Sequence, residues 1–217
     1  MLDFSILTDN IDLYMKGFVN TIKISIIGLV ASFILGNLIA VFRLAPVKLL
    51  NFIGAVYVEV IRNIPLILTG FFFYNGLSYF HINLSGFIAG TIALSIYTAA
   101  FIAEAVRAGI QSVDKGQLEA ARSTGLTYTQ AMRYVVLPQA IKIVIPPIGN
   151  QFLNLVKNSS ILGVFAGLDL MYYADLIHEK TWITFDTYIF VGMFYLILTI
   201  PLSLLVNYLE RRLARSS

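Results

Sequence analysis

The fold is constrained above all by a series of apolar runs, each about as long as a bilayer core is thick. A helix of roughly 20 apolar residues crosses the hydrocarbon core of a membrane. The sequence has five such runs, at residues 18–42, 64–80, 84–106, 138–164 and 187–209. Only 12% of the residues are charged, against about a quarter in soluble domains. We therefore predict an all-α polytopic membrane protein with five transmembrane helices, in which residues 1–217 form one transmembrane domain.

The residue inventory excludes several kinds of site. The chain has no cysteine, which rules out disulfides, thiolate metal ligands and cysteine nucleophiles. Its two histidines, His81 and His178, lie far apart without metal-ligand spacing. The sequence has no Gly-rich phosphate loop ending in Lys-Ser or Lys-Thr, and no nucleophile–base pair. We therefore expect no catalytic residue, no metal and no cofactor bound by this chain.

Prolines and charges modify three of the expected segments. Glu59, Arg62, Asn63 and Pro65 interrupt an apolar stretch at residues 51–80, so we expect residues 47–62 to lie partly in the membrane interface and the span itself to be 64–80. Pro146 and Pro147 lack the amide hydrogen that a helix needs, so we expect a break in the fourth run. The segment before the first run carries aspartates and lacks a basic start, so we expect no cleavable signal peptide.

Lysine and arginine are distributed unequally between the two ends of the expected helices, and the richer side is usually cytoplasmic. The richer side carries Arg43, Lys48, Arg107, Lys115, Arg122, Arg133, Lys142, Arg211, Arg212 and Arg215. The other side carries Lys16, Lys23 and Lys180. Because five spans put the termini on opposite sides, we predict the N-terminus outside and the C-terminus in the cytoplasm.

The longest polar stretch, residues 114–137, joins the third and fourth runs. Asp114 and Thr127 each stand where a side chain can cap a helix, with a glutamine three residues later in both cases. Gly125 stands where the first of these helices would end. The pattern predicts a helix–Gly–helix hairpin, and the charge distribution places it in the cytoplasm. The alternative interpretation is an ordinary loop with a solvated charged face.

Several residues of this hairpin stand in a fixed register, and they are Glu119, Ala120, Ala121, Gly125, Val135, Leu137 and Pro138. Three residues separate Ala121 from Gly125, nine separate Gly125 from Val135, and one separates Val135 from Leu137. This register resembles the EAA loop of ABC-importer permeases, in which isoleucine stands at the place of Val135. The whole chain looks like the polar amino-acid branch of that family, including the segments 59–65 and 154–160.

The resemblance implies the membrane-spanning subunit of an ATP-driven importer for polar amino acids in a prokaryotic cytoplasmic membrane. It implies a separate ATPase subunit that binds ATP and Mg, and an extracytoplasmic substrate-binding protein. It also implies a second permease copy, as a homodimer or a heterodimer, because five helices form only half a pathway. The implied mechanism is alternating access in the lipid membrane, and no nucleic acid takes part.

The same resemblance assigns roles to residues of the hairpin. It implies that the hairpin acts as a coupling helix, which docks in a groove of the ATPase subunit. Glu119 would supply a charged or capping contact, and Ala120 and Ala121 are small enough for close helix approach. Arg122 would contact the rim of the groove, and Gly125 would allow the sharp turn.

Polar residues within the fourth run are candidates for substrate binding, because polar groups at membrane depth are costly. Asn150, Asn154 and Asn158 follow one another at a spacing of four, and Lys157 lies three residues after Asn154. In one interpretation this face lines the pathway, where amides hydrogen-bond the amino acid and Lys157 pairs with its carboxylate. In the other, the asparagines join helices and Lys157 extends towards the membrane surface.

Two polar residues of the third run are further candidates. Tyr97 lies near the middle of the run, and Glu104 lies one turn from its cytoplasmic end. Glu104 stands three residues before Arg107, so it can form an ion pair there. Alternatively, it faces the cavity as an anion, which would favour basic amino acids such as arginine, lysine or histidine.

Two other functions remain open from the sequence. An ion-gradient-driven secondary transporter or channel subunit could use Lys157 and Glu104 as a charge relay. A scaffold or receptor subunit would transport nothing. Transport by the reconstituted chain without any ATPase subunit would distinguish the first of these from an ABC importer.

Overall fold

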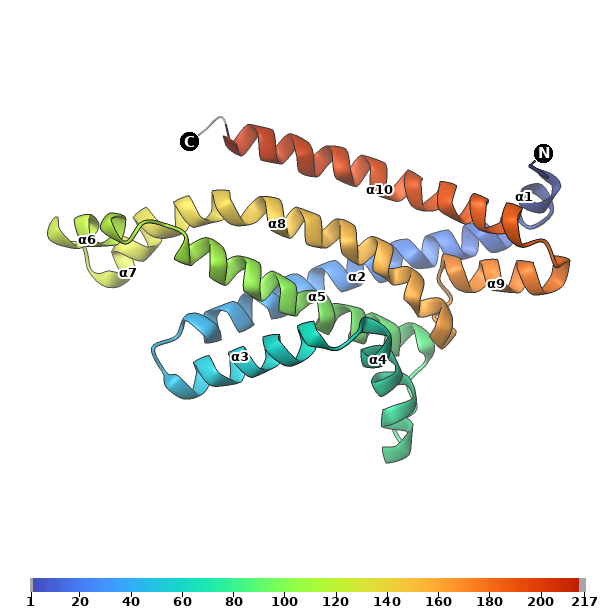
Figure 1. Cartoon of the computed structure of the whole chain (residues 1–217), viewed down its shortest axis with the longest axis horizontal. Helices are drawn as coiled ribbons and strands as arrows, with labels where there is room; N and C mark the ends of the chain where they lie inside the picture. Colours follow the sequence, from blue (N-terminus) through green and yellow to red (C-terminus); the bar gives the residue numbers. More distant parts are fainter. Residues whose placement is uncertain (1, 215–217) are drawn as a thin grey trace.

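Long helices run roughly along one common axis and carry the hairpin at one end (Figure 1). The computed structural model describes residues 2–214, so Arg215, counted above among the basic residues, lies outside it. The helices apolar enough to cross a membrane are α2 (Ile11–Leu44), α5 (Gly86–Gln111), the helix Tyr128–Phe165 that contains α8 (Leu137–Asn158), and α10 (Thr184–Ala214). Residues 2–214 contain no strand. The predicted all-helical membrane fold is therefore confirmed.

The second crossing is a bent pair of helices, so four or five spans result, depending on how the pair is counted. Helix α3 (Lys48–Asn63) meets the segment Leu66–Phe80 at an angle of 108°. This segment contains α4 (Leu66–Phe71), the π-helix Phe72–Gly76 and the 3-10 helix Leu77–Phe80. Ile64 is extended between the two arms, because a proline disfavours the helical conformation of the residue before it. In Figure 1, α4 points away from the other helices.

Helix α3 packs along α2 and α5 at the edge of the bundle, with Gly54 and Val58 buried. Val58 of α3 is fully buried and clusters with Ile39 and Ala40 of α2 and with Ala103 of α5. The expectation that residues 47–62 lie partly in the membrane interface stays a prediction. The charged residues that suggested an interfacial position lie on the exposed side of α3, while its opposite side is apolar.

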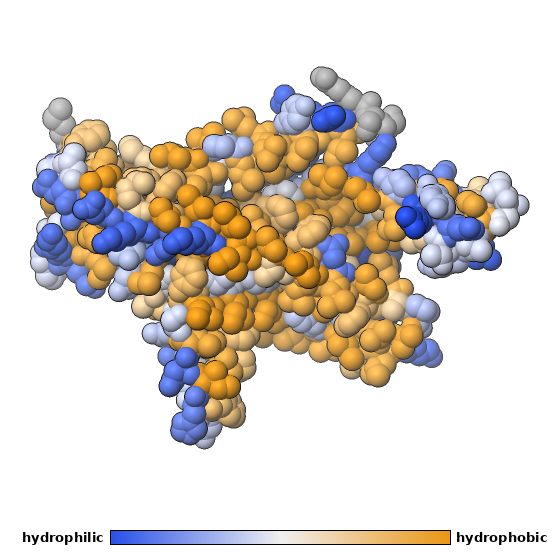
Figure 2. All heavy atoms as spheres, turned by 180° about the vertical axis from the view of Figure 1, so that it is seen from behind, coloured by the Kyte–Doolittle hydropathy of each residue, from blue (hydrophilic) through white to orange (hydrophobic). Residues whose placement is uncertain are grey.

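Helix α5 forms the centre of the bundle, in contact with α2, α3, α4 and α8. Its buried face is made largely of small residues, among which Ala99, Ala100 and Ala103 are fully buried. Small side chains let neighbouring helices approach closely, which favours helix association in membranes. By contrast, α10 exposes many large apolar side chains, and Figure 2 shows a broad hydrophobic middle with hydrophilic residues gathered towards the ends. An apolar surface of this kind is suited to contact with membrane lipid.

Helix α9 (Leu170–Thr181) lies at the end of the bundle opposite the hairpin, near α1 (Ser5–Asp9) (Figure 1). The fully buried Asp169 caps it by accepting hydrogen bonds from the amides of Met171 and Tyr172, at 3.1 and 3.3 Å. Burial raises the pKa of the Asp169 carboxyl to about 7, although these hydrogen bonds act in the opposite direction. The Leu170 amide donates to the hydroxyl of Thr21 at 2.9 Å, which joins α9 to α2.

The fourth crossing is a continuous helix. It begins at Tyr128, ten residues before the predicted start at Pro138, and runs to Phe165. Pro146 and Pro147 lie inside α8 without ending it, so the expected break at these residues is wrong. Membrane helices tolerate prolines when neighbouring structure satisfies the freed backbone groups, and α8 is packed between α5 and α10.

Candidate functional site

The hairpin is built from two short helices joined at a glycine. Helix α6 (Lys115–Ser123) is capped by Asp114, which accepts a hydrogen bond from the Gly116 amide at 2.6 Å. Gly125 follows the end of α6 with a φ of +92°, a conformation that glycine adopts without penalty. Helix α7 (Tyr128–Ala131) begins with a full capping box between Thr127 and Gln130. The predicted helix–Gly–helix structure is thus confirmed, whereas its cytoplasmic location stays a prediction.

The outer face of the hairpin displays most of the residues to which the resemblance assigned a coupling role. Glu119, Ala120, Arg122 and Gly125 are exposed at the end of the molecule (Figure 1). Ala121 is only 7% exposed and faces the interior of the hairpin. A partner that approaches this face would therefore meet Glu119, Ala120 and Arg122 directly, while Ala121 holds the hairpin together.

Helix α8 carries an exposed stripe that is polar in its second half. The exposed residues recur at alternating spacings of four and three, and they are Ile143, Pro147, Asn150, Asn154 and Lys157. This spacing puts them on one face of the helix. Asn158 is half-buried beside this face, so the structure brings three of the four predicted residues together and places the fourth at their edge.

The amides of this stripe make no hydrogen bond within the part of the chain that the structure describes. Neither Asn150 nor Asn154 makes a side-chain hydrogen bond to any residue in the range 2–214, whereas Leu155 and Val156 on other faces of α8 are buried. An amide without a partner is costly in a hydrocarbon environment. The stripe therefore suits a water-filled path or the surface of another subunit better than lipid.

Tyr97 belongs to a different group of side chains. Its ring lies 5.0 Å from the ring of Phe101, one turn further along α5. The guanidinium of Arg62, from α3, lies over Phe101 at 5.3 Å. These contacts group Tyr97 with α3 and α5, and no hydrogen bond joins it to the α8 stripe within residues 2–214.

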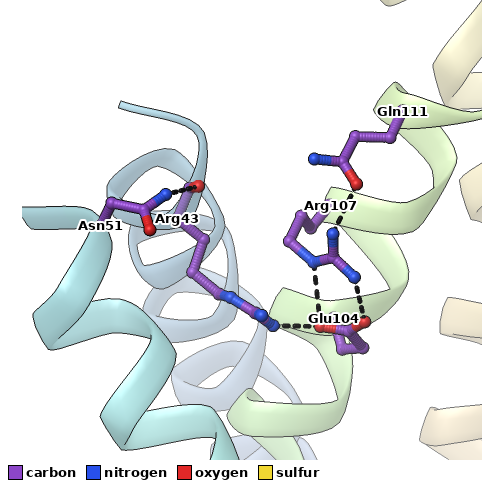
Figure 3. A network of polar contacts seen from close by, with 5 residues as sticks. All are labelled: Arg43, Asn51, Glu104, Arg107 and Gln111. Atoms are coloured by element: carbon purple, nitrogen blue, oxygen red, sulfur yellow. Dashed lines mark hydrogen bonds and ion pairs between the residues drawn. The ribbon is translucent and has the colours of Figure 1, made fainter. Parts of the chain in front are cut away.

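Glu104 is held by two arginines at the hairpin end of α5 (Figure 3). Arg107 binds both carboxylate oxygens, with distances of 3.1 Å from Nε to Oε2 and 2.5 Å from Nη2 to Oε1. Arg43, at the end of α2, forms a second ion pair with Oε2. The ion pair between Glu104 and Arg107, one of the two alternatives left open by the sequence, is therefore confirmed.

Arg43 was not predicted from the sequence as a partner of Glu104, because the two residues are 61 positions apart. A signal for it was present, since Arg43 and Glu104 lie at the same expected membrane level, each near the cytoplasmic end of its span. The contact extends further, because Asn51 of α3 donates to the backbone carbonyl of Arg43 and Arg107 donates to Gln111. We refer to these five side chains as the Glu104 network (Figure 3).

The chain matches known membrane transport proteins over nearly its whole length. A family model described as "Binding-protein-dependent transport system inner membrane component" matches residues 28–215. The chain is 64% identical to the probable glutamine ABC transporter permease protein GlnM of Bacillus subtilis (strain 168), over 99% of this chain and 100% of the relative. It is 32% identical to the glutamate/aspartate import permease protein GltK of Escherichia coli O157:H7, over 98% of both chains.

Solved structures agree in fold. The structure of an amino acid ABC transporter with histidines superimposes with a TM-score of 0.92 at 39% identity, covering 98% of this chain and 99% of the other. The inward-facing MetNI methionine ABC transporter, at 22% identity and a TM-score of 0.70, shares the fold. The chain thus belongs to the family of binding-protein-dependent inner-membrane transport components, as a permease subunit of the amino-acid ABC importer type.

Proposed function

We propose that the substrate of this permease is a polar amino acid with a neutral amide side chain, of the glutamine type. The observation that supports this most is the α8 stripe, whose polar members are two amides and a lysine and include no carboxylate. Amide groups donate and accept hydrogen bonds, so Asn150 and Asn154 complement another amide. Lys157 can pair with the substrate carboxylate. The name of the relative GlnM points to the same substrate.

A basic substrate has less support than the sequence alone suggested. That expectation needed Glu104 as a free anion facing the cavity. Both oxygens of Glu104 are bound by arginine guanidinium groups, so a cationic substrate would have to displace an existing ion pair. We therefore keep Glu104 out of the proposed substrate site.

The proposed mechanism is alternating access driven by a separate ATPase subunit. The hairpin docks on that subunit through Glu119, Ala120 and Arg122, and a second permease copy completes the pathway along the α8 stripe. Since the hairpin joins α5 directly to the helix that contains α8, its displacement can shift a two-state equilibrium of both crossings. Ion-gradient-driven transport is not favoured, because relatives of this chain are ABC permeases.

The proposal is tested by uptake into proteoliposomes that contain the permease, its ATPase subunit and its binding protein. We expect ATP-dependent uptake of labelled glutamine in preference to arginine, histidine and glutamate. Asn154→Leu should reduce this uptake by about tenfold or more, because the proposed hydrogen bond between its amide and the substrate is lost. The matched control is Asn207→Leu, the same change at an exposed position of α10.

Two results would contradict the proposal. Preferential uptake of arginine would overturn the substrate class. Uptake of any amino acid by the permease without its ATPase subunit would overturn the mechanism.

A further inference from the structure

We propose that Glu104 is a positioning residue that joins α2, α3 and α5 into one rigid unit at the base of the hairpin. A displacement of the hairpin would then move three helices together, not α5 alone. The inference rests on the proposed function, in which ATP binding at the ATPase subunit displaces the hairpin. It states which helices move with the hairpin.

The contacts form a continuous chain from α3 to the last residue of α5, next to the hairpin (Figure 3). Asn51 of α3 binds the carbonyl of Arg43 at the end of α2, and Arg43 pairs with Glu104 of α5. Arg107 then joins Glu104 to Gln111, the last residue of α5. The hairpin helix α6 begins at Lys115, only four residues later. The network thus lies directly beside the segment through which the hairpin would act.

Glu104 is the one negatively charged side chain of the network, and it faces the two positively charged side chains of Arg43 and Arg107. Its side chain is 24% exposed, and those of Arg43 and Arg107 are 13% and 25% exposed. Charges this far from water are screened less than exposed ones. Replacing Glu104 with glutamine leaves two guanidinium groups without their counter-ion, and these repel each other. The neutral variant should therefore separate the end of α2 from α5.

Directional contacts matter here because, within residues 2–214, no other side-chain hydrogen bond or ion pair joins α2 to α5. Small residues such as Gly36 and Ala99 meet across this interface, so that a Cβ added to Gly36 would lie 2.9 Å from the Ala99 carbonyl oxygen. Packed helices of this kind can slide past one another in shear motions. A charge-assisted hydrogen bond fixes geometry more strictly than apolar contact does. Glu104 therefore sets the register of α2 against α5 at the end where force enters.

The rigidity is tested by a distance measurement in the assembled transporter. Because the chain has no cysteine, Val47→Cys and Ala108→Cys can carry two spin labels without background. Val47 lies exposed between α2 and α3, and Ala108 is exposed on α5. Labelled chain is diluted with unlabelled chain so that the measured distance lies within one subunit.

We expect one narrow distance distribution that is the same in the nucleotide-free and ATP-bound states. Adding Glu104→Gln should broaden it or make it depend on nucleotide. A distance that changes on ATP binding in the parent chain would overturn the proposal. So would a Glu104→Gln variant that keeps the narrow, invariant distribution. This measurement does not depend on which amino acid is carried.

The consequence for transport is tested by the number of amino acids taken up per ATP hydrolysed. Glu104→Gln should lower this ratio by about tenfold, within the usual range of coupling between two sites, while ATPase association is retained. The matched control is Glu179→Gln, since Glu179 is exposed on α9, at the other end of the molecule, and forms no ion pair within residues 2–214. Its ratio should equal that of the parent chain.

A role in stability alone predicts a different outcome, in which less complex assembles but the ratio is unchanged. That result would overturn the positioning role. The exchange Arg43→Glu with Glu104→Arg restores an ion pair between α2 and α5, so it should recover more of the ratio than Arg43→Glu alone. If the parent complex shows no ATP-dependent uptake, the proposed function fails, whereas the spin-label distances still decide the role of Glu104.

Discussion

At the scale of single residues, the fold depends on close contacts between segments far apart in sequence. Gly86, at the start of α5, lies so near the end of the fourth crossing that an added Cβ would stand 1.7 Å from the carbonyl oxygen of Phe165. No side chain fits there without a backbone shift. The absence of a side chain at Gly86 therefore positions the start of α5 against Phe165.

Gly86→Ala should reduce stability by about 1–3 kcal/mol or more, as overpacking of a filled site does. The thermal unfolding midpoint of the detergent-purified protein would measure this change. Gly192→Ala is the matched control, because nothing lies within 4 Å of a Cβ at Gly192 and alanine favours the helix. Equal midpoints for the two variants would contradict the steric argument.

The sequence predicts contacts between residues that are close along a helix but not those between helices. The spacing of three between Glu104 and Arg107 was enough to predict their ion pair as one alternative. Arg43 could not be paired with Glu104 in the same way, because the two residues lie on different helices and spacing along one helix does not give the register of α2 against α5. The exposed face of α8 was predictable in part, since asparagines at a spacing of four already define one side of a helix.

At the scale of elements, helix ends were easier to predict than helix continuity. The cap at Thr127 and the turn at Gly125 have local causes, and both are present. The unbroken course of α8 through Pro146 and the 108° bend at Pro65 are opposite outcomes for the same residue type. Helix α8 as a whole packs against α5 and α10, whereas Pro65 stands between the two arms of the bent pair, after the exposed residues Asn63 and Ile64.

The hairpin gives a prediction at this scale. Gly125→Val forces a β-branched residue into a positive φ, which costs about 1–2 kcal/mol or more, so the two hairpin helices should lose their arrangement and ATPase co-purification should fall. Gly125→Asn is the control, since asparagine tolerates this conformation. Because a Cβ at Gly125 meets nothing within 4 Å, neither variant is expected to clash there through its Cβ, and the two differ in how well they tolerate the positive φ. Equal co-purification of both variants would argue against a docking role for this turn.

At the scale of the whole molecule, the arrangement of charges predicts its orientation. The hairpin and α9 lie at opposite ends of the molecule (Figure 1). The basic residues of α6 and those in the last turn of α10 are expected on the same side of the membrane. The apolar runs could be located in the sequence, because the transfer free energy of apolar side chains favours the membrane. Their orientation could be predicted from the distribution of lysine and arginine. The sequence also separated residues 47–62 from the run 64–80, but it did not predict the angle of 108° between the two arms.

Topology can be checked by labelling intact cells with a membrane-impermeant maleimide, again using the absence of cysteine. A cysteine at the exposed Glu179 of α9 should be labelled from outside. A cysteine at the exposed Ser123 of α6 should react only after the membrane is opened. The reverse pattern would show that the predicted orientation is wrong.

The bend at Pro65 has a consequence for how the chain enters the membrane during synthesis. Segment Leu66–Phe80 is shorter than the roughly 20 residues that a lone helix needs to cross a bilayer, so it cannot be expected to insert on its own hydrophobicity. Its contacts are made with α5 and with Phe165, both of which are synthesised later. The second crossing would therefore reach its final position only after downstream helices emerge from the ribosome, and chains truncated before α5 should leave this segment misplaced.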